Sequence, residues 1–358
     1  MIPQWNKEFD LSKISFELRK NLKKRNISQG KITENFQKKI SNFLKVKYVI
    51  TVPNGTVGLL VALKALNLKK GDEIIVSDRA WISVLNVIKF LDLKPIFVDV
   101  EKDRPVIDIR KIKKKITKKT KVIIPVHMGG RGCNIDELKK IIGKKKIFIL
   151  EDAAQAFGSK VNKKFLGTTS DIGCFSMSIA KTISSGQGGF IVTNNKKIFN
   201  RILKIKNNGL KDIKNISRWG ELGLNFKFND ILATIAISEI ERFNFYKNKL
   251  INLYKLYNKN LNSNKIRLIE VDIKNGEIPQ YIEILALKRK KLLNYLKKKK
   301  IDVRIFYPSM SESKLFNLKS FNNLNNSKKF SKFGLYLPSG PNQKLKDINY
   351  VINKINSF

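Results

Sequence analysis

A lysine at position 181 stands where an amine could act as a nucleophile. It follows the largely apolar stretch 177–180, and the turn after it is built of small residues, among them Ser184 and Gly188. A lysine shielded from water loses its proton more easily and can then form a Schiff base with a carbonyl compound. In a chain so rich in lysine, it is this setting that singles out Lys181.

An acidic pair, Glu151 and Asp152, follows the four apolar residues 147–150. Open parallel sheets bind their ligands at the carboxyl ends of the strands, where Asp152 would lie. A carboxylate buried there must meet a cation or strong hydrogen-bond donors, because burying it alone is too costly. In isolation, a role for Asp152 as the cap of a following helix is an equally good interpretation.

A third segment, 53–63, indicates a site for an anion. A strand leads into Asn54, Gly55 and Thr56, and a helix begins at once. The free N–H groups of a helix N-terminus attract anions, glycine permits close approach, and threonine adds a hydroxyl group. A plain turn in which the threonine caps the helix is the alternative.

The other residue types exclude several kinds of site. Cys133 and Cys174 are far apart and His127 is the only histidine, which excludes a disulfide framework and a thiolate zinc site. A serine triad would depend on that single imidazole. We expect no metal, and His127 could either line a pocket or have a structural role.

The net charge of +43 suggests a polyanion partner, but the kind of charge argues against a specific one. Lysine outnumbers arginine about fivefold, whereas arginine is preferred for reading phosphates and bases. The lysines are spread over the whole chain, together with many Asn, Ile and Phe residues whose codons are also rich in A and T. Codon composition therefore explains the charge, and we expect only weak, salt-sensitive binding to nucleic acid.

The elements that must position these residues alternate between strand and helix. Apolar runs predict strands at 48–52, 73–77, 95–100, 121–126, 146–151, 174–176 and 189–193, with helices at 56–66, 82–91 and 135–142 between them. This alternation is typical of an α/β domain with a mostly parallel sheet covered on both faces.

The pattern changes after about residue 225. A helix from 230 to 243, continuing to about 261, is followed by a strand at 281–285, a helix at 288–299, a strand at 303–306 and a last helix from 346. We predict a large α/β domain over 1–240, with residues 1–30 leading in, and a small α+β domain over 241–358. With no apolar run of membrane-spanning length and no secretory signal, we expect a cytoplasmic protein.

Together, in this order, the segments resemble the nucleotide-sugar aminotransferases of the DegT/DnrJ/StrS family, which are pyridoxal-phosphate enzymes of the aspartate-aminotransferase fold type. The resemblance is carried by MIPQW, NGT-x-x-L, GDEIIVSDRAWISVLNVI, PIFVDV, PVHMGG, EDAAQAFG, DIGCFSMSIAKTISSGQGG, GLNFKFND and LYLPSGP, and by the 29 residues from Asp152 to Lys181. It implies fold type I of the PLP-dependent transferases, with a mostly parallel, mixed seven-stranded sheet and a small C-terminal domain.

The resemblance implies roles around the cofactor ring. Lys181 would carry pyridoxal 5'-phosphate and move the proton during transamination. Asp152 would pair with the pyridine nitrogen, Gln155 would contact the ring hydroxyl, and Trp81 would stack on the ring.

It also implies a phosphate site and a partner. Gly55, Thr56 and Ser176 would hold the phosphate, and Asn225 would reach the phosphate of a neighbouring subunit, which implies a homodimer with shared active sites. Lys227 stands where the family often has arginine.

The implied reaction moves an amino group, most simply from glutamate, onto a keto-sugar linked to a nucleotide, for polysaccharide or glycan synthesis. We expect a 6-deoxy-4-keto sugar, as in perosamine synthases. The family also includes sugar dehydratases in which histidine replaces the Schiff-base lysine, and a non-catalytic regulatory relative is a second alternative. Departures at Gln187, Asn208 and Met310 leave the identity of the sugar open.

Overall fold

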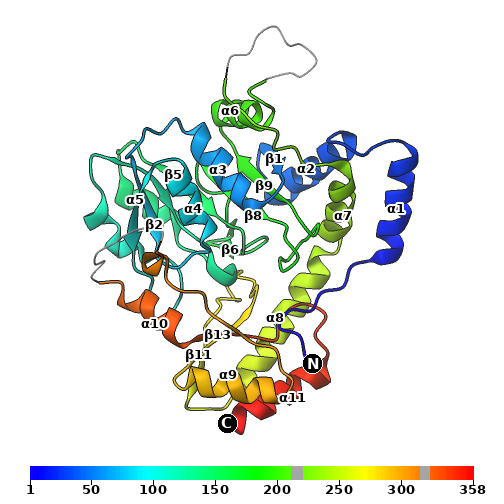
Figure 1. The fold of residues 1–358 in the computed structure, drawn as a ribbon, viewed down its shortest axis with the longest axis vertical. Helices are drawn as coiled ribbons and strands as arrows, with labels where there is room; N and C mark the ends of the chain where they lie inside the picture. The colour runs from blue at the N-terminus through cyan, green and yellow to red at the C-terminus, as the bar shows by residue number, and fades with distance from the viewer. Residues whose placement is uncertain (211–220, 315–322) are drawn as a thin grey trace.

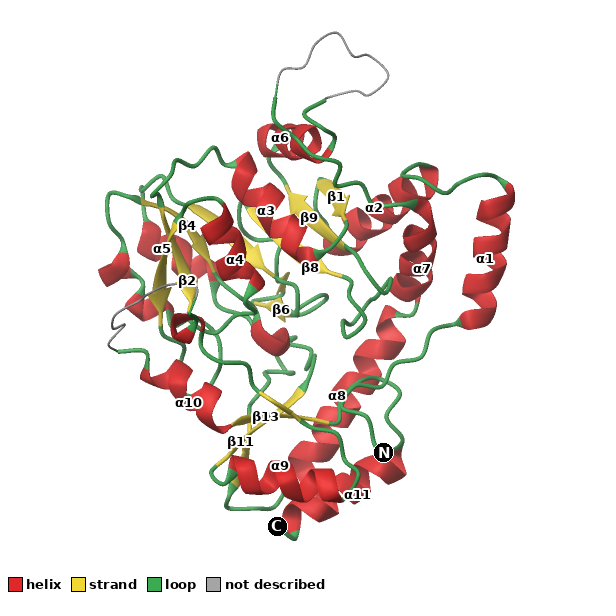
Figure 2. Ribbon diagram, in the orientation of Figure 1, coloured by secondary structure: helices red, strands yellow, loops and turns green. Residues whose placement is uncertain are grey.

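The computed structural model describes residues 1–210, 221–314 and 323–358. A seven-stranded sheet lies at its centre (Figures 1 and 2), in the order β1-β9-β8-β5-β4-β2-β3. Strand β9 is antiparallel to both of its neighbours, and the other pairings are parallel. The predicted α/β class with a mostly parallel, mixed sheet is therefore confirmed. The strands are β1 (Tyr48–Val52), β2 (Glu73–Ser77), β3 (Lys94–Val98), β4 (Thr120–Ile124), β5 (Phe148–Asp152), β8 (Ile172–Ser176) and β9 (Gly189–Thr193).

Helices cover both faces of this sheet, which explains why its strands are largely apolar. In β2, Ile74 and Val76 pack with one set of helices, while Ile75 between them packs with another. Successive side chains of a strand point to opposite faces, so both faces need a cover. One face carries α3 (Gly55–Ala65), α4 (Ser83–Phe90) and α6 (Lys196–Lys206); the other carries α2 (Lys31–Leu44), α5 (Ile135–Ile142) and α7 (Asp230–Glu241).

Four helices were not predicted from the sequence. They are α1 (Leu11–Lys23), α2, α6 and α10 (Asn325–Phe333). Helix α2 is attached to α7 by Asp230, whose Oδ1 accepts hydrogen bonds from the Gly30 and Thr33 amides at 3.0 and 2.9 Å. The helix predicted from 230 to 261 is two helices, because α7 ends before Arg242 and α8 (Phe243–Asn260) begins after it.

A second, antiparallel sheet has the order β10-β11-β13-β12. Its strands are β10 (Ile266–Leu268), β11 (Ile282–Ala286), β12 (Arg304–Ile305) and β13 (Gly334–Leu337). The helices α9 (Arg289–Lys298) and α11 (Leu345–Asn356) pack on one face, and α10 (Asn325–Phe333) packs on the other. A separate hairpin is formed by β6 (Lys160–Val161) and β7 (Lys164–Phe165).

The start of the chain lies with this second sheet (Figure 1). Ile2 forms a bridge with Ile301, and Trp5 forms one with Ser339. The chain then crosses to α1, which packs against α7. The division of the chain at residues 240 and 241 stays a prediction.

Candidate active site

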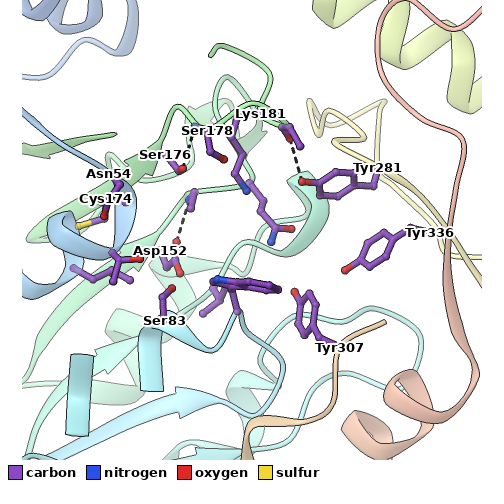
Figure 3. A pocket seen from close by; sticks show the side chains of 18 of the residues that line it. Asn54, Ser83, Asp152, Cys174, Ser176, Ser178, Lys181, Tyr281, Tyr307 and Tyr336 are labelled. Carbon is purple, nitrogen blue, oxygen red and sulfur yellow. Dashed lines mark hydrogen bonds between the residues drawn. The ribbon is translucent and has the colours of Figure 1, made fainter. Parts of the chain in front are cut away.

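A cavity of about 560 Å³ lies between the two sheets. One wall comes from the carboxyl ends of β5 and β8, the start of α3 and the loop after β2; the opposite wall comes from the second sheet and its loops. In Figure 3, Asn54, Asp152 and Ser176 lie on one side, and Tyr281, Tyr307 and Tyr336 lie on the other. Of the eight residues predicted to form the site, seven line this cavity: Gly55, Thr56, Trp81, Asp152, Gln155, Ser176 and Lys181.

Lys181 lies in a turn five residues beyond the end of β8. Its side chain is withdrawn from water, and this desolvation lowers the pKa of its amine to about 8, although Asp152 acts in the opposite direction. The amine is therefore about half neutral at pH 8, where an ordinary lysine is almost fully protonated. This is the property that a nucleophilic lysine needs.

Asp152 ends β5 and is only 5% exposed. Its Oδ1 accepts a hydrogen bond from the Ala154 amide at 3.0 Å, and its backbone is bonded on both sides to the segment 125–127. Burial raises the pKa of this carboxyl group, while the Ala154 amide and Lys181 oppose the shift. The described residues 153–159 that follow Asp152 contain no helix, so Asp152 is not a helix cap. A carboxylate held in this way still needs a cationic partner in the cavity.

The start of α3 forms a cradle beside Ser176. Asn54, and not the threonine considered from the sequence, is the N-cap: its Oδ1 accepts a hydrogen bond from the Val57 amide at 2.9 Å. A Cβ atom on Gly55 would lie 3.1 Å from the Cβ of Ser176, so a side chain here would occupy the cradle. First-turn N–H groups, the Thr56 hydroxyl and the Ser176 hydroxyl suit a bound anion such as phosphate.

Trp81 and Gln155 occupy the space between these groups. Trp81 is 56% exposed and meets the ring of Tyr307 edge-on, with centroids 5.5 Å apart. Gln155 Oε1 accepts a hydrogen bond from the Gly129 amide at 3.0 Å. A flat aromatic ligand could therefore lie against Trp81 with its edge toward Asp152.

His127 does not line the cavity. It is fully buried, and its Nε2 lies 2.8 Å from Oε2 of Glu151, while its Nδ1 accepts a weak hydrogen bond from the Cys133 amide at 3.4 Å. Glu151 also accepts hydrogen bonds from the Gly167 and Thr169 amides, and its pKa is lowered, against the effect of burial, first by His127 and then by the Gly167 amide. Of the two roles left open, the structure therefore favours the structural one. The partner of the histidine was not predicted, although strand alternation places Glu151 on the face opposite Asp152.

Asn225 is the one predicted site residue that lies elsewhere. It is exposed, does not line this cavity, and pairs through its backbone with Asn207. A role across a subunit boundary stays a prediction.

Several lining residues were missed by the sequence analysis. They are Gln4, Ser83, Tyr281, Arg304, Tyr307 and Tyr336 among others. Burial raises the pKa of the three tyrosines, so each keeps its hydroxyl proton and can donate a hydrogen bond. The missed residues come from separate strands and loops, so no local sequence pattern predicts that they line one cavity.

The described part of the chain contains neither a metal-binding cluster nor a membrane-spanning helix. Over residues 1–210, 221–314 and 323–358, no group of three or more His, Cys, Asp or Glu side chains is arranged to hold a metal ion. Within the same ranges, no helix has the length and apolar character needed to span a bilayer.

Comparison with known proteins gives matches over the whole chain. The family model for the DegT/DnrJ/EryC1/StrS aminotransferases matches residues 11–356. The GDP-perosamine synthase of Escherichia coli O157:H7 is 33% identical over 348 residues, covering 92% of this chain and 91% of that protein. The enzyme of the same name from Vibrio cholerae is 29% identical, with 92% of each chain covered. The structure of E. coli GDP-4-keto-6-deoxy-D-mannose-3-dehydratase with bound hydrated PLP has the same fold, with a TM-score of 0.90, 23% identity and 99% of each chain covered.

Proposed function

This chain belongs to the DegT/DnrJ/EryC1/StrS aminotransferase family, and from that premise we propose that it transfers an amino group to a nucleotide-linked keto-sugar with pyridoxal 5'-phosphate as cofactor. The observation that carries the proposal is the cavity in which a low-pKa lysine, a buried carboxylate and an anion cradle meet. We name Lys181 as the catalytic residue.

The residues of the cavity fit this cofactor in three ways. Gly55, Thr56 and Ser176 would hold the phosphate in the cradle that any side chain at position 55 would fill. The charges of Lys181 and His127 only partly oppose the effect of burial, so the pKa of the Asp152 carboxyl group stays raised, and a protonated pyridine nitrogen would add a cation beside it. Trp81 offers a half-exposed ring for stacking. Gln155 would reach the edge of the cofactor ring.

When bound, pyridoxal phosphate withdraws electrons from the carbon that loses or gains a proton. The protein supplies the rest of the chemistry. Lys181, with a pKa near 8, can both accept and return a proton close to neutral pH, because both of its protonation states are populated there. Burial raises the pKa of Asp152, so a cation facing it would stabilise its charged form, and the carboxylate would in turn favour the protonated form of a ring nitrogen placed there.

We propose a 6-deoxy-4-keto sugar nucleotide as the amino acceptor. Two relatives that cover most of the chain are named GDP-perosamine synthases. The wall opposite Asp152 carries Tyr281, Tyr307 and Tyr336, whose rings offer apolar surface to a deoxygenated sugar carbon and whose hydroxyls can bind sugar oxygens. Arg304 lines the same wall and could face a diphosphate.

The dehydratase alternative shares the fold, so the fold does not discriminate between the two reactions. Lys181 does, because the resemblance assigns a histidine to that position in the dehydratases. His127 is buried against Glu151 and cannot take its place without leaving that contact.

Three further parts of the proposal go beyond the cavity itself. We propose glutamate as amino donor, a homodimer in which Asn225 contacts the partner's cofactor phosphate, and a cytoplasmic location in the service of polysaccharide or glycan synthesis. The exposed position of Asn225 and the burial of both cysteines as free thiols support the second and third parts.

An absorption spectrum tests the proposal. The protein purified with pyridoxal phosphate should show a yellow band that fades when glutamate is added and is absent in Lys181→Ala. A band that glutamate leaves unchanged would contradict the donor, and no band at all would favour a non-catalytic relative. A panel of 4-keto sugar nucleotides with no turnover would exclude the proposed acceptor.

A further inference from the structure

We infer that Lys7 and Glu239 are positioning residues for Lys181: the buried pair fixes the backbone that carries this lysine. The inference rests on the proposed role of Lys181 and goes beyond it, because neither residue lines the cavity.

Lys7 reaches the turn of Lys181 from the N-terminal segment. Its Nζ donates hydrogen bonds to the carbonyl oxygen of Lys181 at 3.2 Å and to that of Thr182 at 2.9 Å. Its side chain is 1% exposed and is ion-paired with Glu239, whose side chain is fully buried. A single ammonium group thus holds two consecutive carbonyls, the first of which belongs to the lysine itself.

Glu239 extends this attachment from α7. Its Oε2 accepts a hydrogen bond from the Ser184 amide at 3.2 Å, and its Oε1 accepts one from the Tyr246 hydroxyl at 2.7 Å. The Nζ atom of Lys7 lies over the ring of Tyr246, 4.4 Å from the ring centroid. The pair therefore connects the N-terminal segment, the turn after Lys181 and the junction of α7 with α8.

The carbonyl before Lys181 is held from the other side. The Ala180 oxygen accepts hydrogen bonds from Gln280 Nε2 at 2.7 Å and from the Tyr281 hydroxyl at 3.1 Å, the latter drawn in Figure 3. The backbone at Lys181 is thus fixed between two sets of donors, Gln280 and Tyr281 on one side and Lys7 on the other. This restricts the direction in which the Lys181 side chain leaves the backbone, which is toward the cavity.

Stability alone does not account for the pair. Two charges moved out of water cost more than apolar side chains of similar volume, and such pairs are often replaced by apolar residues without loss of stability. Apolar residues could fill the space of Lys7 and Glu239, but they could not bond the carbonyls of Lys181 and Thr182. What the charges provide is a defined position for that segment.

The test uses the full chain and a charge-neutral double variant, Lys7→Met with Glu239→Gln. The glutamine can still accept from Ser184 or Tyr246, and no buried charge is left without a partner. The matched control is Lys13→Met, which removes a lysine ion-paired with Glu241 at 2.6 Å on the surface. Tyr246→Phe, which removes only one donor to Glu239, serves as a milder variant.

Two readouts are needed. The first is hydrogen exchange of the 178–186 amides in cofactor-free protein; the second is the rate constant at which glutamate bleaches the cofactor band, compared with the affinity for the cofactor. We expect the double variant to exchange faster in this segment and to react ~10- to 100-fold more slowly, with cofactor affinity changed by less than about threefold. Tyr246→Phe should move both readouts less and in the same direction, and Lys13→Met should match the wild type.

Wild-type exchange in the double variant, or a wild-type bleaching rate, would overturn the inference. Equal losses of rate and cofactor affinity would also overturn it, because they indicate general disruption of the fold. If the wild-type protein itself gives no cofactor band, the proposed function fails, and the exchange experiment still decides whether Lys7 and Glu239 fix the segment.

Discussion

Replacing Lys181 by methionine should stabilise the cofactor-free protein while abolishing its reaction. The pKa of the buried amine falls from 10.5 to about 8. At about 1.4 kcal/mol per pH unit, keeping the protonated amine in the fold costs roughly 3 kcal/mol. Methionine fills similar space without this cost.

The sign of the pH dependence follows from the same shift. Below pH 8 the amine is charged in both folded and unfolded chains and the full cost applies; above 10.5 it is neutral in both and the cost vanishes. The advantage of Lys181→Met over the wild type should therefore shrink as the pH rises through this window. The shift already includes the attraction of Asp152 for the amine, which opposes the effect of burial, so we expect a gain of roughly 1–3 kcal/mol at pH 7.

Urea denaturation of the cofactor-free proteins at pH 7 and at pH 10 measures this difference. Lys197→Met, at an exposed position on α6, is the control and should change stability little at either pH. An equal or lower stability of Lys181→Met at pH 7, or a gain that does not depend on pH, would refute the reasoning.

Three other substitutions have defined outcomes. Glu151→Gln should lower the free energy of unfolding by ~3–5 kcal/mol in urea titrations, because it removes a buried charge that His127 and two backbone amides neutralise; a loss below about 1 kcal/mol would contradict this. Gly55→Ala should weaken cofactor binding at least about tenfold in a spectroscopic titration, since its Cβ would lie 3.1 Å from that of Ser176 in the cradle, while the melting temperature stays within a few degrees. Asp152→Asn should slow the reaction with glutamate by a factor of at least ~100 in stopped-flow measurements, because it removes the charge that we propose faces the ring nitrogen. A rate within tenfold of the wild type would exclude that role.

The strands of the central sheet could be predicted because each contains a short run of apolar residues. Runs such as 73–77 are buried on both faces, and a buried strand is continuously apolar whatever its neighbours are. The predicted ends of β3 and β4 differ from the observed ends by one or two residues. The residue types at these ends do not mark a clear strand boundary. The break at Arg242 was missed because apolar spacing continues on both sides of it.

The site was predictable in part for a related reason. Asp152 and Ser176 end strands, and Gly55 starts a helix, so topology brings them to one edge of the sheet. The tyrosine wall and Lys7 depend on how the second sheet and the N-terminal segment meet that edge. These contacts join residues more than 100 positions apart, which no local pattern records.

The bridges from Ile2 to Ile301 and from Trp5 to Ser339 have a consequence for biosynthesis. The partners of the first residues are synthesised about 300 residues later. At a synthesis rate of ~5–20 residues per second, this delay is roughly 15–60 s. The central sheet, complete by residue 193, can assemble during that interval. The segment that carries Lys7 therefore docks late in synthesis, and a nascent chain has its sheet before the turn of Lys181 is fixed.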